Sequence, residues 1–148
     1  MNRIIKVLMG LATVVLMCFA SSSCSKEKTN ERNIVGKWQS TSVNAKLYES
    51  DKLVTEKSEN CTGWYIGFNF KSNGNGQLIS YEETGVTETS EMTWVIMGKK
   101  LMITSNSETV TLDIIEIKNN SMTLSITEEE KYNNITYKTV ATIYFSKM

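Results

Sequence analysis

The sequence predicts an all-β protein: an eight-stranded antiparallel up-and-down β-barrel, preceded by a signal peptide and a short tether. From Ile34 onward, apolar and polar residues alternate in short segments rich in Thr, Ile, Val, Tyr and Trp. Such alternation is typical of strands with one buried and one solvated face. Turn-forming residues separate the segments at short intervals, which indicates hairpin connections. Closing the resulting meander into a barrel would remove exposed sheet edges, and a β-sandwich is the alternative.

Composition excludes several classes of function. The chain has 148 residues, the length of one domain, with no His and a formal net charge of zero. Without His, a Ser-His-Asp or Cys-His site is impossible within this chain, and so is an imidazole-ligated metal. A neutral chain is not expected to bind nucleic acid. No group of residues indicates catalysis or a metal site, so we expect a non-enzymatic protein without a cofactor.

Residues 1–23 have the pattern of a secretory signal peptide. Arg3 and Lys6 precede 14 uncharged residues, Val7 to Ala20, and three serines follow. The apolar run is shorter than the roughly 20 residues that a transmembrane helix needs.

Small residues directly before Cys24 resemble a bacterial lipobox, although the usual Leu is replaced by Ser21. The resemblance implies that Cys24 becomes the lipidated first residue of a mature envelope lipoprotein, which we expect at the outer membrane. Cleavage without lipidation is the alternative.

The segment after the predicted lipidation site is expected to be a tether. Residues 24–33 contain no large apolar side chain and alternate in charge. We therefore interpret them as a flexible, solvated linker, with the folded domain spanning residues 34–148. Once Cys18 is removed and Cys24 is acylated, Cys61 would remain as a single thiol, which excludes an intrachain disulfide.

The strands are placed by their alternation. The first is expected near 34–43 or 34–48, and the pair of Asn-Gly sequences within Ser72–Gly76 predicts a hairpin turn. A slip in the apolar phase between Ile114 and Ile117 indicates a β-bulge. The stretches 46–63 and 128–134 lack a clear period and are expected to be connections. The other seven strands are predicted near residues 64–71, 76–82, 86–96, 100–104, 108–118, 121–128 and 135–147.

The order of several short motifs resembles a known family. Gly36 and Trp38 form a Gly-x-Trp sequence at the entry to the first strand, and the segments 68–76, 92–96 and 100–103 follow in the expected order. Over residues 34–147 the chain is similar to the short lipocalin-like domains of bacterial lipoproteins of unknown role. The resemblance implies that Trp38 closes one end of the barrel. Two motifs of larger lipocalins are absent: the Thr-Asp-Tyr loop and a late Arg packed across the Trp.

Four aromatic residues are candidates for a ligand site. Trp38, Trp64, Phe68 and Trp94 would line a cavity for a small apolar ligand, or they would fill the core. An eight-stranded barrel has an interior that side chains can fill or that holds one small ligand. The favoured function is non-catalytic binding of a small hydrophobic ligand. The alternative is a filled barrel that contacts an envelope protein partner, with Lys46–Trp64 as the surface expected to do so.

Overall fold

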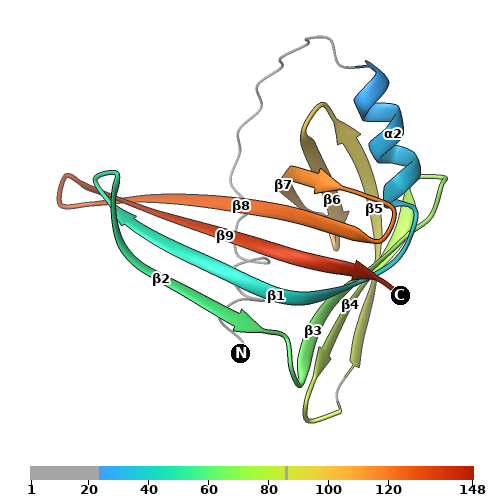
Figure 1. The fold of residues 1–148 in the computed structure, drawn as a ribbon, viewed down its shortest axis with the longest axis horizontal. Coiled ribbons are helices and arrows are strands. Elements are labelled where there is room, and N and C mark those ends of the chain that lie inside the picture. The colour runs from blue at the N-terminus through green and yellow to red at the C-terminus, as the bar shows by residue number, and fades with distance from the viewer. Residues whose placement is uncertain (1–23, 86) are drawn as a thin grey trace.

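The computed structural model describes residues 24–85 and 87–148 of the chain. The predicted signal peptide, residues 1–23, lies outside them. In the described residues, the helix α2 is followed by nine strands (Figure 1). Their bounds are α2 Cys24–Ile34, β1 Gly36–Glu49, β2 Lys52–Asn60, β3 Trp64–Phe70, β4 Asn75–Glu82, β5 Thr87–Met97, β6 Lys100–Ser105, β7 Glu108–Ile117, β8 Ser121–Tyr132 and β9 Ile135–Lys147.

The strands form one antiparallel sheet that closes on itself. Each strand from β3 to β8 pairs with the next along the chain, and β1 pairs with both β3 and β9. Eight strands therefore complete an up-and-down barrel, as predicted. Strand β2 lies outside this ring, because it pairs only with β1 and ends the sheet order.

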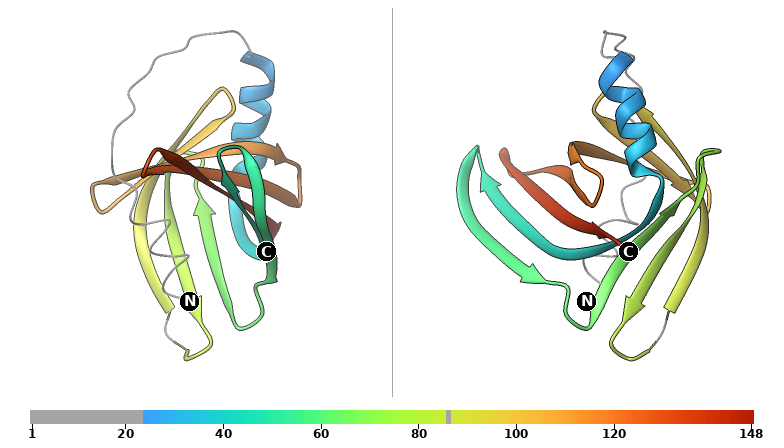
Figure 2. Two further views of the ribbon diagram at one scale, coloured as in Figure 1. Left: turned by 90° about the vertical axis from the view of Figure 1, so that its left-hand side faces the viewer. Right: turned by 45° about the vertical axis from the view of Figure 1, so that its right-hand side comes forward.

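Four strands continue beyond the barrel as a projection that we call the arm. It consists of β2 together with residues 42–49 of β1, 126–132 of β8 and 135–142 of β9. Strand β1 pairs with β3 only over Gly36–Gln39, and β8 pairs with β7 only as far as Ser125. The remaining lengths of these strands therefore have only one another and β2 as neighbours. Figures 1 and 2 show the arm extending well past the short strands β3–β7.

The sequence-based strand positions agree with the structure except in the arm. The stretch 46–63 was expected to be irregular, but it continues β1 to Glu49 and then forms β2. The predicted connection 128–134 is also wrong, because β8 extends to Tyr132 and leaves a two-residue turn at Asn133 and Asn134. Both turn residues have positive φ, 49° and 65°, as tight hairpins require.

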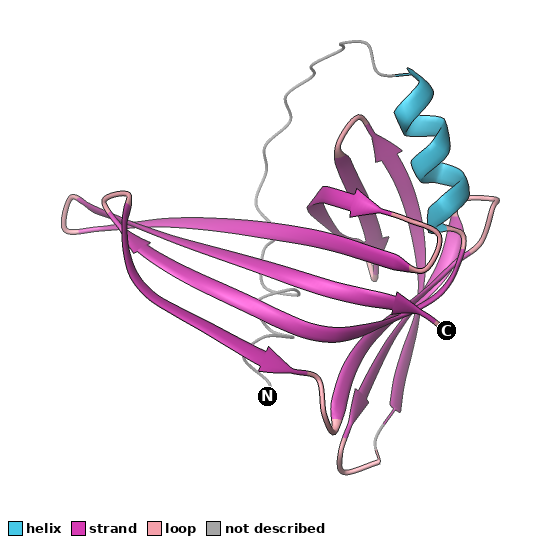
Figure 3. Ribbon diagram, viewed as in Figure 1, coloured by secondary structure: helices cyan, strands magenta, loops and turns pink. Residues whose placement is uncertain are grey.

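The expected flexible tether is instead the helix α2. Its sequence contains no Gly or Pro, and it places Glu27 in the first turn and Arg32 in the last, which suits the helix dipole. The last residue, Ile34, is fully buried in the core cluster and fastens the helix to the barrel. Figure 3 shows the helix standing at one end of the strands. Tertiary contact therefore orders a polar segment that has no apolar periodicity of its own. Within the described residues, no helix is long and apolar enough to cross a membrane.

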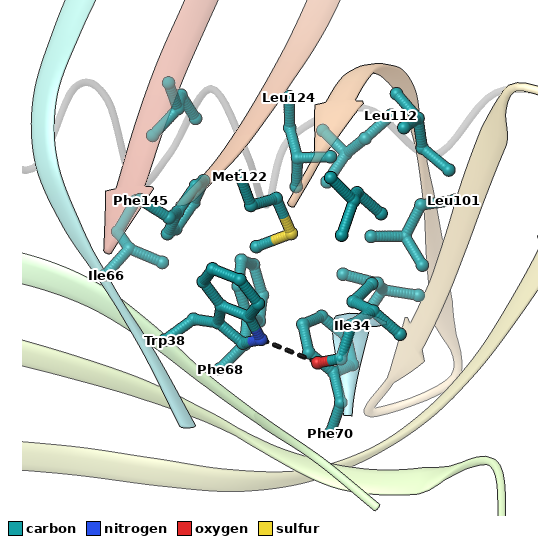
Figure 4. Close-up of a cluster of buried hydrophobic side chains, with 14 of the residues drawn as sticks. Ile34, Trp38, Ile66, Phe68, Phe70, Leu101, Leu112, Met122, Leu124 and Phe145 are labelled. Carbon is teal, nitrogen blue, oxygen red and sulfur yellow. Dashed lines mark hydrogen bonds between the residues drawn. The ribbon is translucent and has the colours of Figure 1, made fainter. Parts of the chain in front are cut away.

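The core lies inside the barrel, where the inward-facing residues of all eight ring strands meet (Figure 4). Aromatic and aliphatic side chains interdigitate there, and three close ring pairs involve Phe68, Phe70, Phe145 and Trp94. The predicted bulge in β7 is confirmed by a register shift between Ile114 and Glu116. It leaves Ile114 and Ile117 buried and Ile115 exposed.

Candidate functional site

Trp38 closes one end of the barrel. Its side chain is fully buried, and its Nε1 donates a hydrogen bond of 2.6 Å to the carbonyl oxygen of Ile34 (Figure 4). A buried indole N–H needs such a partner, because leaving it unpaired would cost about 1–3 kcal/mol. The bond also ties the end of α2 to the start of β1. The closing role expected of Trp38 is therefore what the structure shows.

A late cation packs against Trp38 although the chain has no late Arg. Lys147 Nζ lies 5.0 Å from the centre of the Trp38 ring and donates a 3.1 Å hydrogen bond to the carbonyl oxygen of Asn33. Lys147 is the last residue of β9, whose end pairs with β1 at Trp38. The late Arg of larger lipocalins is absent from the sequence, and a lysine lies across the ring in its place.

Gly36 allows this arrangement. Its φ is +130°, a conformation that residues with a side chain rarely adopt, and a Cβ there would lie 2.6 Å from Lys147 Cε. The glycine thus turns the chain from α2 into β1 and leaves room for the lysine. These contacts explain the Gly-x-Trp sequence: Gly36 leaves room for the Lys147 side chain, and Trp38 packs against its cation.

Three of the four candidate aromatic residues belong to the core. Trp38, Trp64 and Phe68 are all buried, and Phe68 packs against Phe70 and Phe145. The fourth, Trp94, packs edge-on against Phe70 and is half-buried. Trp94 Nε1 donates to the carbonyl oxygens of Lys71 and Asn75, which fixes the β3–β4 turn. The structure therefore brings these residues into one core, with Trp94 at its margin.

Trp64 differs from the others because it lies where the barrel meets the arm. It begins β3, and its Nε1 donates to Glu59 of β2 at 3.3 Å. The connection before it is held by a backbone hydrogen bond from Cys61 to Thr41. Cys61 itself contacts Ser40, whose hydroxyl accepts the N–H of Ile66, and burial raises the pKa of the Cys61 thiol. A raised pKa lowers the fraction of this cysteine that is present as the nucleophilic thiolate.

The inner face of the barrel continues along β1, β8 and β9 onto the arm. A register shift between Ser40 and Ser42 changes the phase of β1, so that Val43 faces the core. Ala45 and Leu47 then follow on the same face. Ala45 lies opposite Ala141 of β9, which in turn lies opposite the buried Ile126 of β8. This row of three apolar residues lies beyond the last pairings with β3 and β7. Sequence analysis missed it, because the phase change hides the continuing alternation.

The next row outward introduces a carboxylate. Thr139 lies between Leu47 on one side and Glu128 on the other. Burial, and secondarily the charge of Glu130, raise the pKa of Glu128 above its ordinary value. Its Oε1 is shielded from solvent and has no hydrogen-bond partner. The inner face of the arm is thus apolar near the barrel and acidic farther out.

A family model described as a lipocalin-like domain matches residues 34–124. The chain belongs to the lipocalin-like domain family. No curated protein matches it.

Two solved structures are similar to this lipocalin-like protein. One is a lipocalin-like protein from Bacteroides uniformis ATCC 8492, with 15% identity, a TM-score of 0.49, and coverage of 78% of this chain and 99% of that one. The other is an uncharacterized protein from Bacteroides eggerthii DSM 20697, with 15% identity, a TM-score of 0.46, and coverage of 77% and 98%. In the chain whose structure is described here, the Gly-x-Trp motif lies at the closed end of the barrel. The inner face that continues past β3 and β7 lies on the arm.

Proposed function

We propose that this protein is a non-catalytic envelope lipoprotein whose barrel binds a small apolar molecule against the inner face of the arm. The observation that supports this most is the continuation of the apolar face past the covered part of the barrel. Ala45, Leu47 and Ala141 extend the core surface where β3 and β7 no longer pair with β1 and β8. Apolar surface of this kind is a favourable place for an apolar ligand.

The closed end of the barrel is a less favourable place for a ligand than the arm. Trp38 and Phe68, two of the residues first considered for ligand binding, contact other core side chains and are buried. A ligand there would have to displace packed aromatic rings. Trp64 is the candidate aromatic that joins the core to the arm, so we place it at the inner limit of the proposed site.

Ala45→Trp tests the site by filling it. We expect the variant to bind N-phenyl-1-naphthylamine, a neutral apolar fluorophore, about tenfold more weakly than the wild type, because the added indole occupies the inner face. Lys46→Trp is the matched control, since Lys46 is the adjacent residue and points to the opposite face of β1. Fluorescence titration measures both. Equal affinity for the two variants would contradict the proposed site.

Lipidation is the second part of the proposal. The small residues before Cys24 resemble a lipobox, and Cys24 is the first residue of α2, so an acyl anchor would be joined to the barrel through the helix. Cys24→Ala should abolish incorporation of labelled palmitate and release the protein from membranes. Continued labelling of this variant would refute Cys24 as the lipidated residue.

Strand β2 favours a second candidate function, the docking of an envelope protein partner. All nine of its residues are exposed, and its outer edge has no neighbouring strand in the described part of the chain. An open edge of this length can accept an added strand. A photo-crosslinking amino acid at Val54, which is 55% exposed, tests this in cells. A reproducible cross-link from position 54 to one protein, lost when the exposed Leu53 of the same strand edge is changed to Lys, would favour the partner function.

A further inference from the structure

The helix α2 is fastened to one end of the barrel by several contacts. Its last residue, Ile34, is buried and accepts the indole N–H of Trp38, while Lys147 bonds to Asn33. Nearer its start, the side chain of Glu27 accepts the backbone N–H of Gly98 at 3.1 Å. The helix therefore contacts the barrel at both of its ends, and it also touches β5 and β7. It fixes where Cys24 lies relative to the barrel.

The β5–β6 turn lies beside the beginning of α2. Glu27, which contacts this turn at Gly98, is three residues after Cys24, a separation of about 4.5 Å along the helix axis. Every view of the fold shows the turn next to the first part of the helix (Figures 1 and 2). Whatever Cys24 is attached to must therefore come close to this turn.

Exposed apolar side chains surround the same turn. Met97 is 60% exposed, and Ile115, in the β7 bulge, is 62% exposed. The bulge lies beside the turn, because Ile114 donates a backbone hydrogen bond to the carbonyl oxygen of Lys99. Val95, on the same face of β5 as Met97, is exposed as well. We call Val95, Met97, Ile115 and the β5–β6 turn the anchor face.

The charges near the anchor face suit lipid headgroups. Lys26 and Lys28 on α2 and Lys99 in the turn are exposed. The acidic residues close to them are engaged within the protein: Glu27 bonds to Gly98, Asp113 pairs with Lys100, and Glu116 pairs with Lys118. Glu31, on the second half of α2, is the remaining acidic residue of the helix. Exposed lysines around apolar side chains are the pattern of a surface that lies at a membrane interface.

We propose that the anchor face rests on the membrane that holds the acylated Cys24, so that Met97 and Ile115 enter the headgroup region. This inference rests on the proposed lipidation of Cys24. Side chains that bind at an interface enter it by about 5–10 Å, a depth comparable with one or two turns of α2. The arm projects sideways from the helix in both figures, so its inner face would remain in the aqueous phase.

Fluorescence quenching in vesicles tests the orientation. The lipidated full-length protein, with Cys61→Ser, carries a single NBD label on Met97→Cys and is reconstituted into phosphatidylethanolamine–phosphatidylglycerol vesicles. The matched control carries the label on Tyr132→Cys, because Tyr132 is 69% exposed and lies at the end of the arm. We expect acyl-chain nitroxide lipids to quench most of the emission at position 97 and to leave position 132 unquenched.

The outcomes separate this inference from the lipidation on which it rests. Flotation of the vesicles reports attachment independently of the label. A protein that fails to float would refute the anchor, and the inference would fall with it. A protein that floats with an unquenched label at position 97 would keep the anchor and overturn the orientation. A label at position 97 shielded from water without nitroxide quenching would assign the anchor face to a protein partner and would also overturn it.

Discussion

Single residues at the barrel's closed end are constrained by contacts that leave no room for alternatives. Gly76 is the clearest case, because a Cβ there would lie 2.4 Å from the carbonyl oxygen of Asn69 and 2.8 Å from Met92 Cε. The first of these atoms belongs to the backbone of the paired strand and cannot turn aside. The Asn-Gly pair at this position is therefore explained by interstrand packing as well as by the turn.

Gly76→Ala should destabilise the barrel. We expect a loss of about 1–3 kcal/mol in the free energy of unfolding, because the methyl group forces β3 and β4 apart. Gly98→Asn is the control: nothing lies within 4 Å of a Cβ at Gly98, and Asn tolerates its φ of +61° better than most residues. Urea titration followed by tryptophan fluorescence measures both. A Gly76→Ala variant as stable as the control would contradict the close strand approach.

Lys147 should contribute to stability through its contact with Trp38. Lys147→Ala removes both the cation over the ring and the hydrogen bond to Asn33, and we expect a loss of about 1–2 kcal/mol. Lys147→Arg keeps a cation at this position and should retain most of the stability. Thermal unfolding of the two variants decides the matter. If both variants lose the same amount of stability, the positive charge over the Trp38 ring does not stabilise the fold.

At the scale of elements, the arm shows what a sequence pattern does and does not reveal. The ring strands were predicted because one face of each is buried, which produces alternation. Every residue of β2 is exposed, so no alternation marks it as a strand. The outer part of β8 fails for the same reason, since Glu129 to Tyr132 are exposed and their pairing with β9 alone makes them a strand. Helix α2 was missed because Ile34 is the one buried side chain in its described part, so no apolar periodicity marks it as a helix.

Glu128 gives the arm a predicted pH response. Its pKa is raised, so the folded state binds the proton more tightly than the unfolded state does. Stability from this residue is therefore greatest at low pH and falls as the pH rises through the folded-state pKa. Glu128→Gln should accordingly be more stable than the wild type at pH 7, and the difference should shrink at pH 4.

Glu129→Gln is the matched control for this comparison, because Glu129 is exposed and its neighbour Lys138 lies opposite it on β9. Removing that charge should give no stabilisation at pH 7. Thermal unfolding at the two pH values measures both variants. A Glu128→Gln variant that is less stable than the wild type at pH 7 would show that the ionised carboxylate is satisfied by a favourable contact.

At the scale of the whole molecule, the structure divides into a closed barrel and an open arm. The Gly-x-Trp motif and the strand order allowed the barrel and Trp38's closing role to be predicted from sequence. The proposed binding surface was not predicted, because it depends on where β3 and β7 stop pairing with their neighbours. Those end points lie close to the register shifts in β1 and β7, and residue spacing alone located only the second of these shifts.

Native mass spectrometry of the protein purified from its source membrane tests the central claim, ligand binding on the inner face of the arm, most directly. The wild type and Ala45→Trp are prepared in parallel, with Lys46→Trp as the control. We predict one small apolar molecule bound to the wild type and to Lys46→Trp, and none bound to Ala45→Trp. A wild type without any bound molecule, or the same molecule on all three proteins, would contradict the proposed site.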